Sequence, residues 1–161
     1  MNLMSSKLNL GMLDVILDYH NFMKYWLVKF APFRTSWQKI LLQGSFTLRG
    51  VRSHEACNNI AKMLPGDQVL FYHSQQELAV IGLASVSTHP FPDPTSPDPN
   101  WLTVTIKPIK TLHRPVSLKE IKSYTALQNI PLIHKPRLSV MPLTEEEFNF
   151  IISLSEKSIL L

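Results

Sequence analysis

The chain has 161 residues, of which 45% are apolar and 17% are charged, a balance typical of a globular domain and not of a disordered segment. That length corresponds to one domain, large enough to bury roughly two thirds of its surface on folding. The sequence holds no apolar run near the ~18 residues that span a bilayer, and its single cysteine excludes an internal disulfide framework. We therefore expect no membrane partner and a reducing, cytoplasmic location.

The net charge of +4 is unevenly distributed along the chain. Residues 24–62 contain seven basic residues and one acidic residue, Glu55. Residues 107–137 contain seven more basic residues and one acidic residue, Glu120. From residue 144 onward the balance is −3. Two basic segments that converge in space would favour a polyanionic partner. An ordinary solvated surface is the alternative.

Residues 1–22 look foreign to the rest of the chain. Asp14 and Asp18 interrupt their apolar clusters, and they contain no arginine, which argues against a signal or transit peptide. Met23 then opens a plausible first strand. We expect residues 1–22 to be an extra segment, either upstream of a true start at Met23 or a loosely attached helix, and residues 23–161 to form a single domain.

The stretch from residue 50 to residue 74 predicts a helix, a turn and a buried strand. An apolar stripe at helical spacing indicates a helix over about residues 53–64, and Pro65-Gly66-Asp67 ends it. Residues 68–72 are β-branched or apolar, as in a core strand. Arg52 at the entry of the helix and Tyr72-His73-Ser74 at the end of the strand would then border a pocket.

The other elements are short strands and helices without regular alternation. We predict strands at residues 25–30, 78–86, 101–106 and 137–141, and helices at residues 37–42, at 117–124 and from Thr144. Capping boxes begin the last two helices, at Ser117–Glu120 and Thr144–Glu147. Gly82 inside a strand indicates a bulge or the close approach of another group. The proline-rich residues 89–100 are predicted to form a stiff connector. The pattern predicts an α+β domain on a small, curled sheet.

Catalytic and metal sites find little support in the sequence. Cys57 and His54 lie three residues apart on one helix, but Cys57 borders the apolar stripe and is expected to be a small buried hydrophobe. The six histidines show no metal-ligand spacing. We expect no enzyme activity, no metal and no cofactor.

Aromatic residues beside basic ones favour binding. Trp37, for example, stands between Arg34 and Lys39. Nucleic-acid sites combine rings that stack on bases with cations that neutralise phosphates. The alternative is that the rings fill the core, which we expect for Trp26, Phe71 and Trp101. For Trp37 both interpretations stay open.

Several motifs together resemble the EVE domain, a member of the PUA-like superfamily related to YTH domains. The resemblance begins at Met23 and covers nearly all of residues 23–155. The motifs are Tyr25-Trp26-Leu27-Val28-Lys29, Gly50-Val51-Arg52, Gly66-Asp67, Phe71-Tyr72-His73-Ser74, Ile81-Gly82, Val116-Ser117-Leu118 and Arg137-Leu138-Ser139-Val140.

The resemblance implies a curled mixed sheet or β-barrel flanked by short helices. It also implies a monomeric, non-enzymatic module whose pocket takes a flipped, modified base of DNA or RNA, such as a methylated or hydroxymethylated cytosine. We expect the pocket to be lined by Arg52, Ser53, Tyr72, His73 and Ser74, with Trp37 as a further wall. Lys29 and Arg137 would neutralise phosphates or support the site.

The chain departs from the family pattern at positions that would contribute to a base pocket. Phe30-Ala31 replace a usual Ser-Glu pair, Thr47-Leu48-Arg49 stand where a tryptophan is usual, and Ser53 replaces an asparagine. A lost stacking ring weakens base binding by ~1–3 kcal/mol. The competing hypothesis is therefore a degenerate EVE fold that serves as a protein-interaction or small-ligand module.

Overall fold

The computed structural model describes residues 23–157, so the hypothesis about residues 1–22 falls outside the described residues. The strands are β1 (Tyr25–Phe30), β2 (Phe46–Thr47), β3 (Gln68–His73), β4 (Ala79–Val86), β5 (Phe91–Pro92), β6 (Leu102–Thr103), β7 (Thr105–Ser117) and β8 (Val140–Leu143). The helices are α2 (Trp37–Gln43), α3 (His54–Ala61), α4 (Leu118–Lys122), the 3₁₀ turn η1 (Thr125–Leu127), α5 (Pro131–His134) and α6 (Glu145–Glu156).

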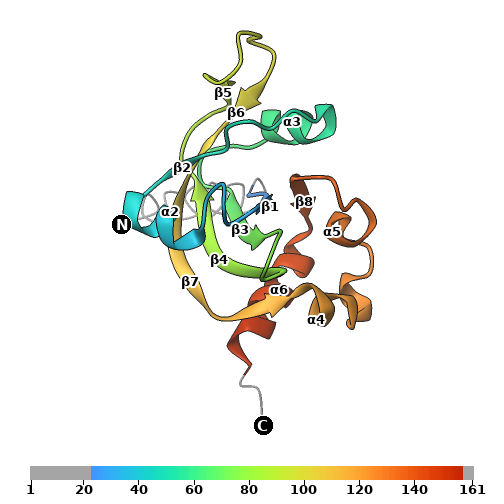
Figure 1. The fold of residues 1–161 in the computed structure, drawn as a ribbon. Helices are drawn as coiled ribbons and strands as arrows, with labels where there is room; N and C mark the ends of the chain where they lie inside the picture. Colours follow the sequence, from blue (N-terminus) through green and yellow to red (C-terminus); the bar gives the residue numbers. More distant parts are fainter. Residues whose placement is uncertain (1–22, 158–161) are drawn as a thin grey trace, which may run out of the picture.

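Six strands form one strongly curled sheet in the order β2-β7-β4-β3-β1-β8, with short helices around it (Figure 1). β1 and β3 run parallel, and the other neighbours are antiparallel. Register shifts between Phe71 and Tyr72 and beside Gly82 add to the curl. β5 and β6 form a separate two-stranded ribbon near α3. This architecture confirms the predicted α+β, PUA-like fold.

Gly82 lies where another group approaches the sheet, as its place in the strand predicted. A Cβ added there would lie 2.2 Å from Cε2 of Trp37, far inside van der Waals contact. The indole of Trp37 is 2% exposed and donates from Nε1 to Oγ1 of Thr111, at 2.9 Å. Trp37 therefore fixes α2 against the inner part of the sheet.

The helix starts follow the predicted caps. Ser53 accepts a hydrogen bond from the backbone N–H of Ala56 and begins α3, and Thr144 with Glu147 forms a complete capping box at α6. At α4 only half of the predicted box exists. Ser117 caps the helix, but the carboxylate of Glu120 pairs with Arg114, because a bidentate ion pair binds it more strongly than one backbone N–H.

Three sequence expectations were wrong in part. β7 continues to Ser117, although Pro108 and Pro115 interrupt the pattern that would have predicted a strand there. The strand expected from Arg137 begins only at Val140. Trp101 is not a core residue: it is half-buried beside the ring of His54, with 5.0 Å between ring centroids. Trp26 and Phe71 are buried, as expected.

Candidate functional site

Arg52 is held by the proline-rich segment that follows β5. Its Nη1 donates to Oδ2 of Asp93 at 2.8 Å and its Nη2 to Oγ1 of Thr95 at 2.9 Å. The guanidinium also lies over the ring of Trp101, with 5.7 Å to the centroid. The side chain of Arg52 is 36% exposed, whereas that of Asp93 is fully buried. Arg52 thus fixes the entry of α3 to the β5–β6 ribbon.

Asp93 accepts three hydrogen bonds in addition to the one from Arg52. The backbone N–H of Gly50 donates to its Oδ2 at 2.8 Å, and the N–H and hydroxyl of Thr95 donate to its Oδ1 at 2.9 and 2.7 Å. Burial by itself raises the pKa of Asp93, but the hydrogen bonds from Arg52, Thr95 and Gly50 outweigh it and hold the pKa well below the usual range. The carboxylate is therefore charged at neutral pH.

Ser53 and Arg137, far apart in the sequence, line one pocket of about 480 Å³ between the start of α3 and the segment before β8. We name it the α3 pocket. Its lining residues are Ser53, Glu55, Lys135, Pro136, Arg137 and Leu138. An amide hydrogen bond from Nδ2 of Asn59 to the carbonyl of Val140, at 2.8 Å, ties the two walls together. The volume falls within the range of ~300–1,000 Å³ usual for ligand sites.

Cations gather around the mouth of the α3 pocket. Nζ of Lys29 donates to the carbonyl of Pro136, and burial lowers the pKa of this lysine. Nζ of Lys135 pairs with Glu55 across the opening, with both side chains about half exposed. Arg137 is exposed. The structure therefore brings together three of the predicted residues, namely Ser53, Lys29 and Arg137.

The other predicted residues lie elsewhere. Tyr72 is 2% exposed, and burial raises its pKa to about 12. Nε2 of His73 accepts a hydrogen bond from the backbone N–H of Trp37, at 3.1 Å. Burial lowers the pKa of His73 while Glu77 opposes the shift, which favours the neutral ring that this hydrogen bond requires. The backbone N–H of Ser74 donates to Phe30.

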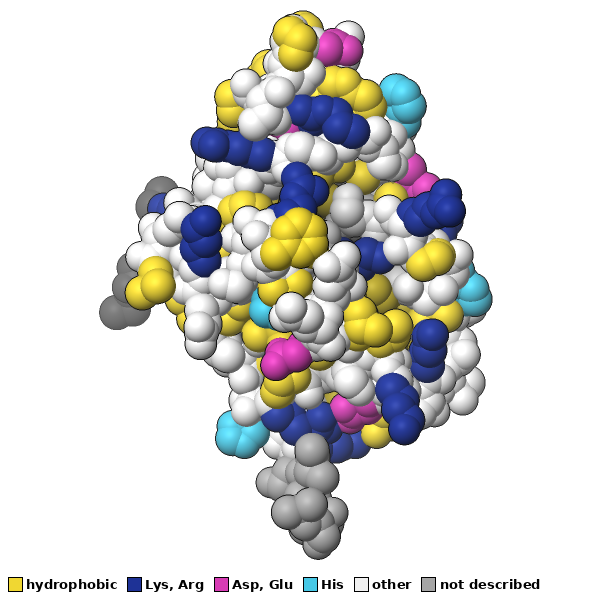
Figure 2. All heavy atoms as spheres, in the orientation of Figure 1, with side chains coloured by type: hydrophobic (Ala, Val, Ile, Leu, Met, Phe, Trp, Pro, Cys, Tyr) yellow, Lys and Arg dark blue, Asp and Glu magenta, His cyan; other side chains and the backbone are white. Residues whose placement is uncertain are grey.

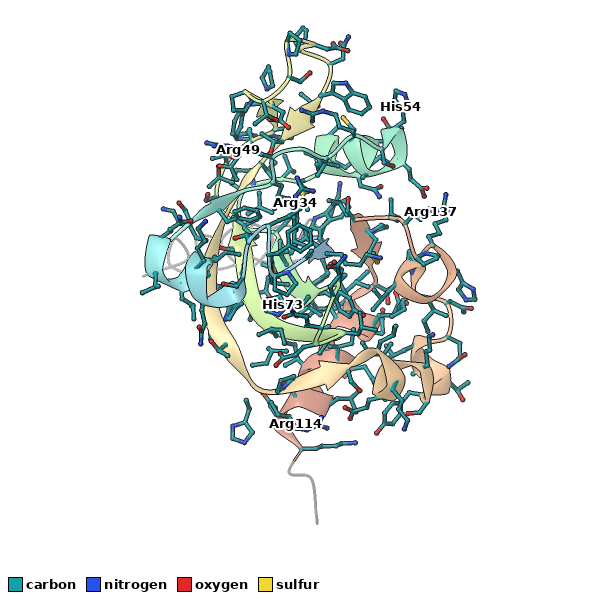
Figure 3. All side chains as sticks on the ribbon, viewed as in Figure 1. Arg34, Arg49, His54, His73, Arg114 and Arg137 are labelled. Carbon is teal, nitrogen blue, oxygen red and sulfur yellow. The ribbon has the colours of Figure 1, made fainter. Side chains whose placement is uncertain are left out.

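Trp37 and His73 line a different pocket of about 440 Å³, beside α2. Figure 3 shows His73 and Arg137 on separate parts of the molecule. Neither Tyr72 nor Ser74 lines the α3 pocket. The sequence placed these groups in one pocket because the entry of the helix and the end of the following strand were expected to lie together, but in the fold they line different pockets. Their part in binding stays a prediction.

The sequence did not single out a third pocket, of about 370 Å³, beside α2 and β2. Arg34, Lys39 and Arg49 are among its lining residues. Their positive charges were visible in the sequence, but only the fold shows that they share one cavity. Asp93 was missed as well; an aspartate followed two residues later by threonine in a proline-rich turn was the available signal.

The described part of the chain also bears on catalysis, metals and membranes. Cys57 is buried and lies next to backbone groups of Asn100 and Leu102, each 3.5 Å from Sγ, in agreement with its expected packing role. Within residues 23–157, no three His, Cys, Asp or Glu side chains are placed to hold a metal ion. No helix in this range has the length and apolarity to cross a membrane.

A family model and a search of known proteins both match this chain to the same group of proteins. The family model described as "EVE domain" matches residues 24–154. Human thymocyte nuclear protein 1 is 33% identical over 131 residues, which cover 67% of this chain and 58% of that protein. The chain thus spans somewhat over half of the length of this relative.

Solved structures agree with the sequence comparison. A protein of Agrobacterium tumefaciens has a TM-score of 0.81 and 37% identity, covering 83% of this chain and 93% of that one. Human THYN1 protein, crystallised in complex with DNA containing 5-methylcytosine, has a TM-score of 0.79 and 29% identity, covering 84% and 99%. By family match, sequence identity and fold together, this chain belongs to the EVE domain family.

Proposed function

We propose that this chain is a non-enzymatic, nucleic-acid-binding module that takes a flipped, modified base into the α3 pocket. The observation that carries the proposal is that Ser53 and Arg137 line one cavity of about 480 Å³, with Lys29 hydrogen-bonded to Pro136 of the same lining. The DNA complex of human THYN1 protein, a relative of the same fold, supports it. The ligand is DNA or RNA, and the module acts as a cytoplasmic monomer.

The lining of the α3 pocket suits a flat, polar ligand. Pro136 and Leu138 supply apolar surface, and the planar guanidinium of Arg137 can stack on a base or bind its edge. Ser53 offers a hydroxyl, although its oxygen already accepts the cap hydrogen bond of α3. Glu55 and Lys135 close the rim by their ion pair.

Outside the α3 pocket, Phe33 is the side chain that would stack on a base of the ligand. Its side chain is 76% exposed, and no other Phe, Tyr or Trp in the range 23–157 is exposed. It lies on the loop between β1 and α2, next to Arg34. An exposed ring beside a cation is the pair that single-stranded nucleic acid uses for stacking and phosphate neutralisation. In the view of Figure 2, Lys and Arg side chains are spread among apolar patches on the surface.

The test is a fluorescence-anisotropy titration of the full chain. The probes are DNA and RNA oligonucleotides of one sequence that carry cytosine, 5-methylcytosine or 5-hydroxymethylcytosine. We expect tighter binding to a modified probe, and a loss of that preference in Arg137→Gln. Lys119→Gln, an equal change of charge at an exposed residue of α4, serves as the control. Equal affinity for every probe would remove the base-reading part of the proposal, and an absence of binding would remove the whole.

A protein-interaction role is the second candidate, and one observation favours it. Leu41 and Leu42 of α2 are 42% and 89% exposed, and Leu41 lines the pocket of about 440 Å³. Exposed leucines beside a pocket are typical of docking surfaces. Leu42→Ser, which leaves the charge of α2 unchanged, would abolish partner binding under this role and leave oligonucleotide affinity unchanged under the nucleic-acid-binding role.

A further inference from the structure

The pocket of about 370 Å³ beside α2 and β2 has a lining unlike that of the α3 pocket. Its residues are Arg34, Thr35, Lys39, Gln43, Ser45, Phe46, Thr47 and Arg49. We name it the cationic pocket. We propose that it is a subsite for one phosphate group, and that in the complex this phosphate belongs to the strand whose base enters the α3 pocket. The identity of that ligand rests on the proposed function.

The charge of the cationic pocket is uncompensated within the described residues. Three cations line it and no carboxylate does. The ion pairs found across residues 23–157 are Arg52–Asp93, Arg114–Glu120 and Lys135–Glu55. Arg34, Lys39 and Arg49 therefore line one cavity without a carboxylate partner among the described residues, and their positive potentials add there.

The side chain of Arg34 lines the cationic pocket beside Gly50. It lies against Gly50, where an added Cβ would stand 2.7 Å from its Nη2, so the guanidinium passes directly over the backbone of this glycine. Gly50 in turn has φ +79° and donates its N–H to Asp93 at 2.8 Å. Asp93 is 1% exposed, is paired with Arg52 and does not line the cationic pocket.

The other groups suit a tetrahedral oxyanion. Arginine guanidinium groups donate paired N–H bonds to phosphate oxygens, and lysine adds a point charge. Thr35, Ser45 and Thr47 place hydroxyl-bearing residues in the same lining. Lys39 comes from the first turn of α2, whose start is fixed by the Ser36 cap. A site with three cations and several hydroxyl groups matches a phosphate better than a singly charged carboxylate.

The cationic pocket and the α3 pocket lie at two ends of one short segment. Arg49 lines the first and Ser53 the second. Four residues of fully extended chain span at most about 14 Å, so one strand can reach both places. Figure 3 shows Arg34, between Arg49 and Arg137 in that view, in keeping with a path for the strand across this face.

Two measurements test the inference. In the first, inorganic phosphate is titrated into the isotope-labelled full chain, and amide NMR shifts are followed at residues 34–49. In the second, the salt dependence of oligonucleotide affinity is compared between wild type, the double variant Arg34→Gln/Arg49→Gln, and the control Lys119→Gln/Lys122→Gln, which removes the same charge from exposed residues of α4. Circular dichroism and thermal melting confirm that both double variants are folded.

We expect phosphate to shift the amides around the cationic pocket in wild type and not in Arg34→Gln/Arg49→Gln. The same variant should lose about tenfold in affinity for an oligonucleotide, and its slope of log K against log salt should be shallower by about 0.7–0.9, the value for one phosphate contact. The control should keep both the affinity and the slope within error.

The inference and the proposed function fail in different ways. Oligonucleotide binding with an unchanged slope in Arg34→Gln/Arg49→Gln and no phosphate shifts would overturn the subsite and leave the proposed function standing. Phosphate shifts at the pocket in a protein that binds no oligonucleotide would overturn the proposed function, and with it the assignment of the phosphate to a strand. An equal loss in the control variant would show general attraction by surface charge and would overturn the subsite.

Discussion

Nη1 of Arg52 lies 2.8 Å from Oδ2 of Asp93, whose side chain has no exposed surface. The two residues join the entry of α3 to the segment that follows β5. The same carboxylate also holds the N–H of Gly50, so the backbone between the cationic pocket and the α3 pocket depends on this pair. Arg52 is therefore a positioning residue for both pockets.

Replacing Arg52 with glutamine should destabilise the fold. The change leaves Asp93 buried with a weaker partner, although Thr95 and Gly50 still donate to it. Because Arg52 is partly exposed, we expect about 2 kcal/mol, less than the 3–5 kcal/mol typical of a fully buried broken pair. Urea unfolding measures it, with Arg114→Gln as the comparison, because its carboxylate partner Glu120 is 22% exposed whereas Asp93 is fully buried. A stability within error of wild type would contradict the role of Arg52.

The stability that Asp93 supplies should depend on pH in a defined direction. Its pKa is lower in the folded chain than in the unfolded one, so the folded state binds fewer protons. The contribution is therefore fully present above about pH 4, the unfolded value, and is lost as the pH falls toward the folded value. The difference in unfolding free energy between wild type and Asp93→Asn should shrink between pH 6.5 and pH 3. A constant or growing difference would contradict this.

The helices and strands could be predicted from the sequence because helix caps, turns and apolar stripes depend on residues that are close together in the chain. The Ser53 cap and the capping box at Thr144 are examples. The site was less readable because its parts come from different elements. Ser53 lies near Arg137 only because α3 packs beside β8. The parallel pairing of β1 with β3 sets Lys29 next to Tyr72, but Lys29 contacts Pro136 of the α3 pocket lining whereas the side chain of Tyr72 is buried.

Buried polar residues are the second reason that the site differed from expectation. His73 and Trp37 carry groups that can bind a base, and sequence alone does not tell whether these groups are already satisfied. In the fold, His73 accepts from the N–H of Trp37, and Trp37 donates to Thr111. Conversely, the three cations of the cationic pocket, which form no ion pair within residues 23–157, looked like ordinary surface charges in the sequence.

Gly82→Ala should be strongly destabilising, because the new methyl group would overlap the indole of Trp37. Overpacking of a core typically costs ~1–3 kcal/mol. Trp37→Leu in the same chain makes room for the methyl group, so the two substitutions should not be additive: Gly82→Ala should cost less in the Trp37→Leu background. A double-mutant cycle by urea unfolding measures this coupling. Additive costs would show that the two residues do not share the space.

Phe33→Ala should weaken oligonucleotide binding without weakening the fold. The ring is 76% exposed, so its loss should change the unfolding free energy by no more than about 0.5 kcal/mol. The loss of one base stack should cost ~1–3 kcal/mol of binding free energy. Leu42→Ala, which removes an apolar side chain that is 89% exposed on the neighbouring helix α2, is the matched control. Anisotropy titrations compare the two variants with wild type. If Phe33→Ala binds as wild type does, the exposed ring takes no part in recognition, and stacking must come from the α3 pocket itself.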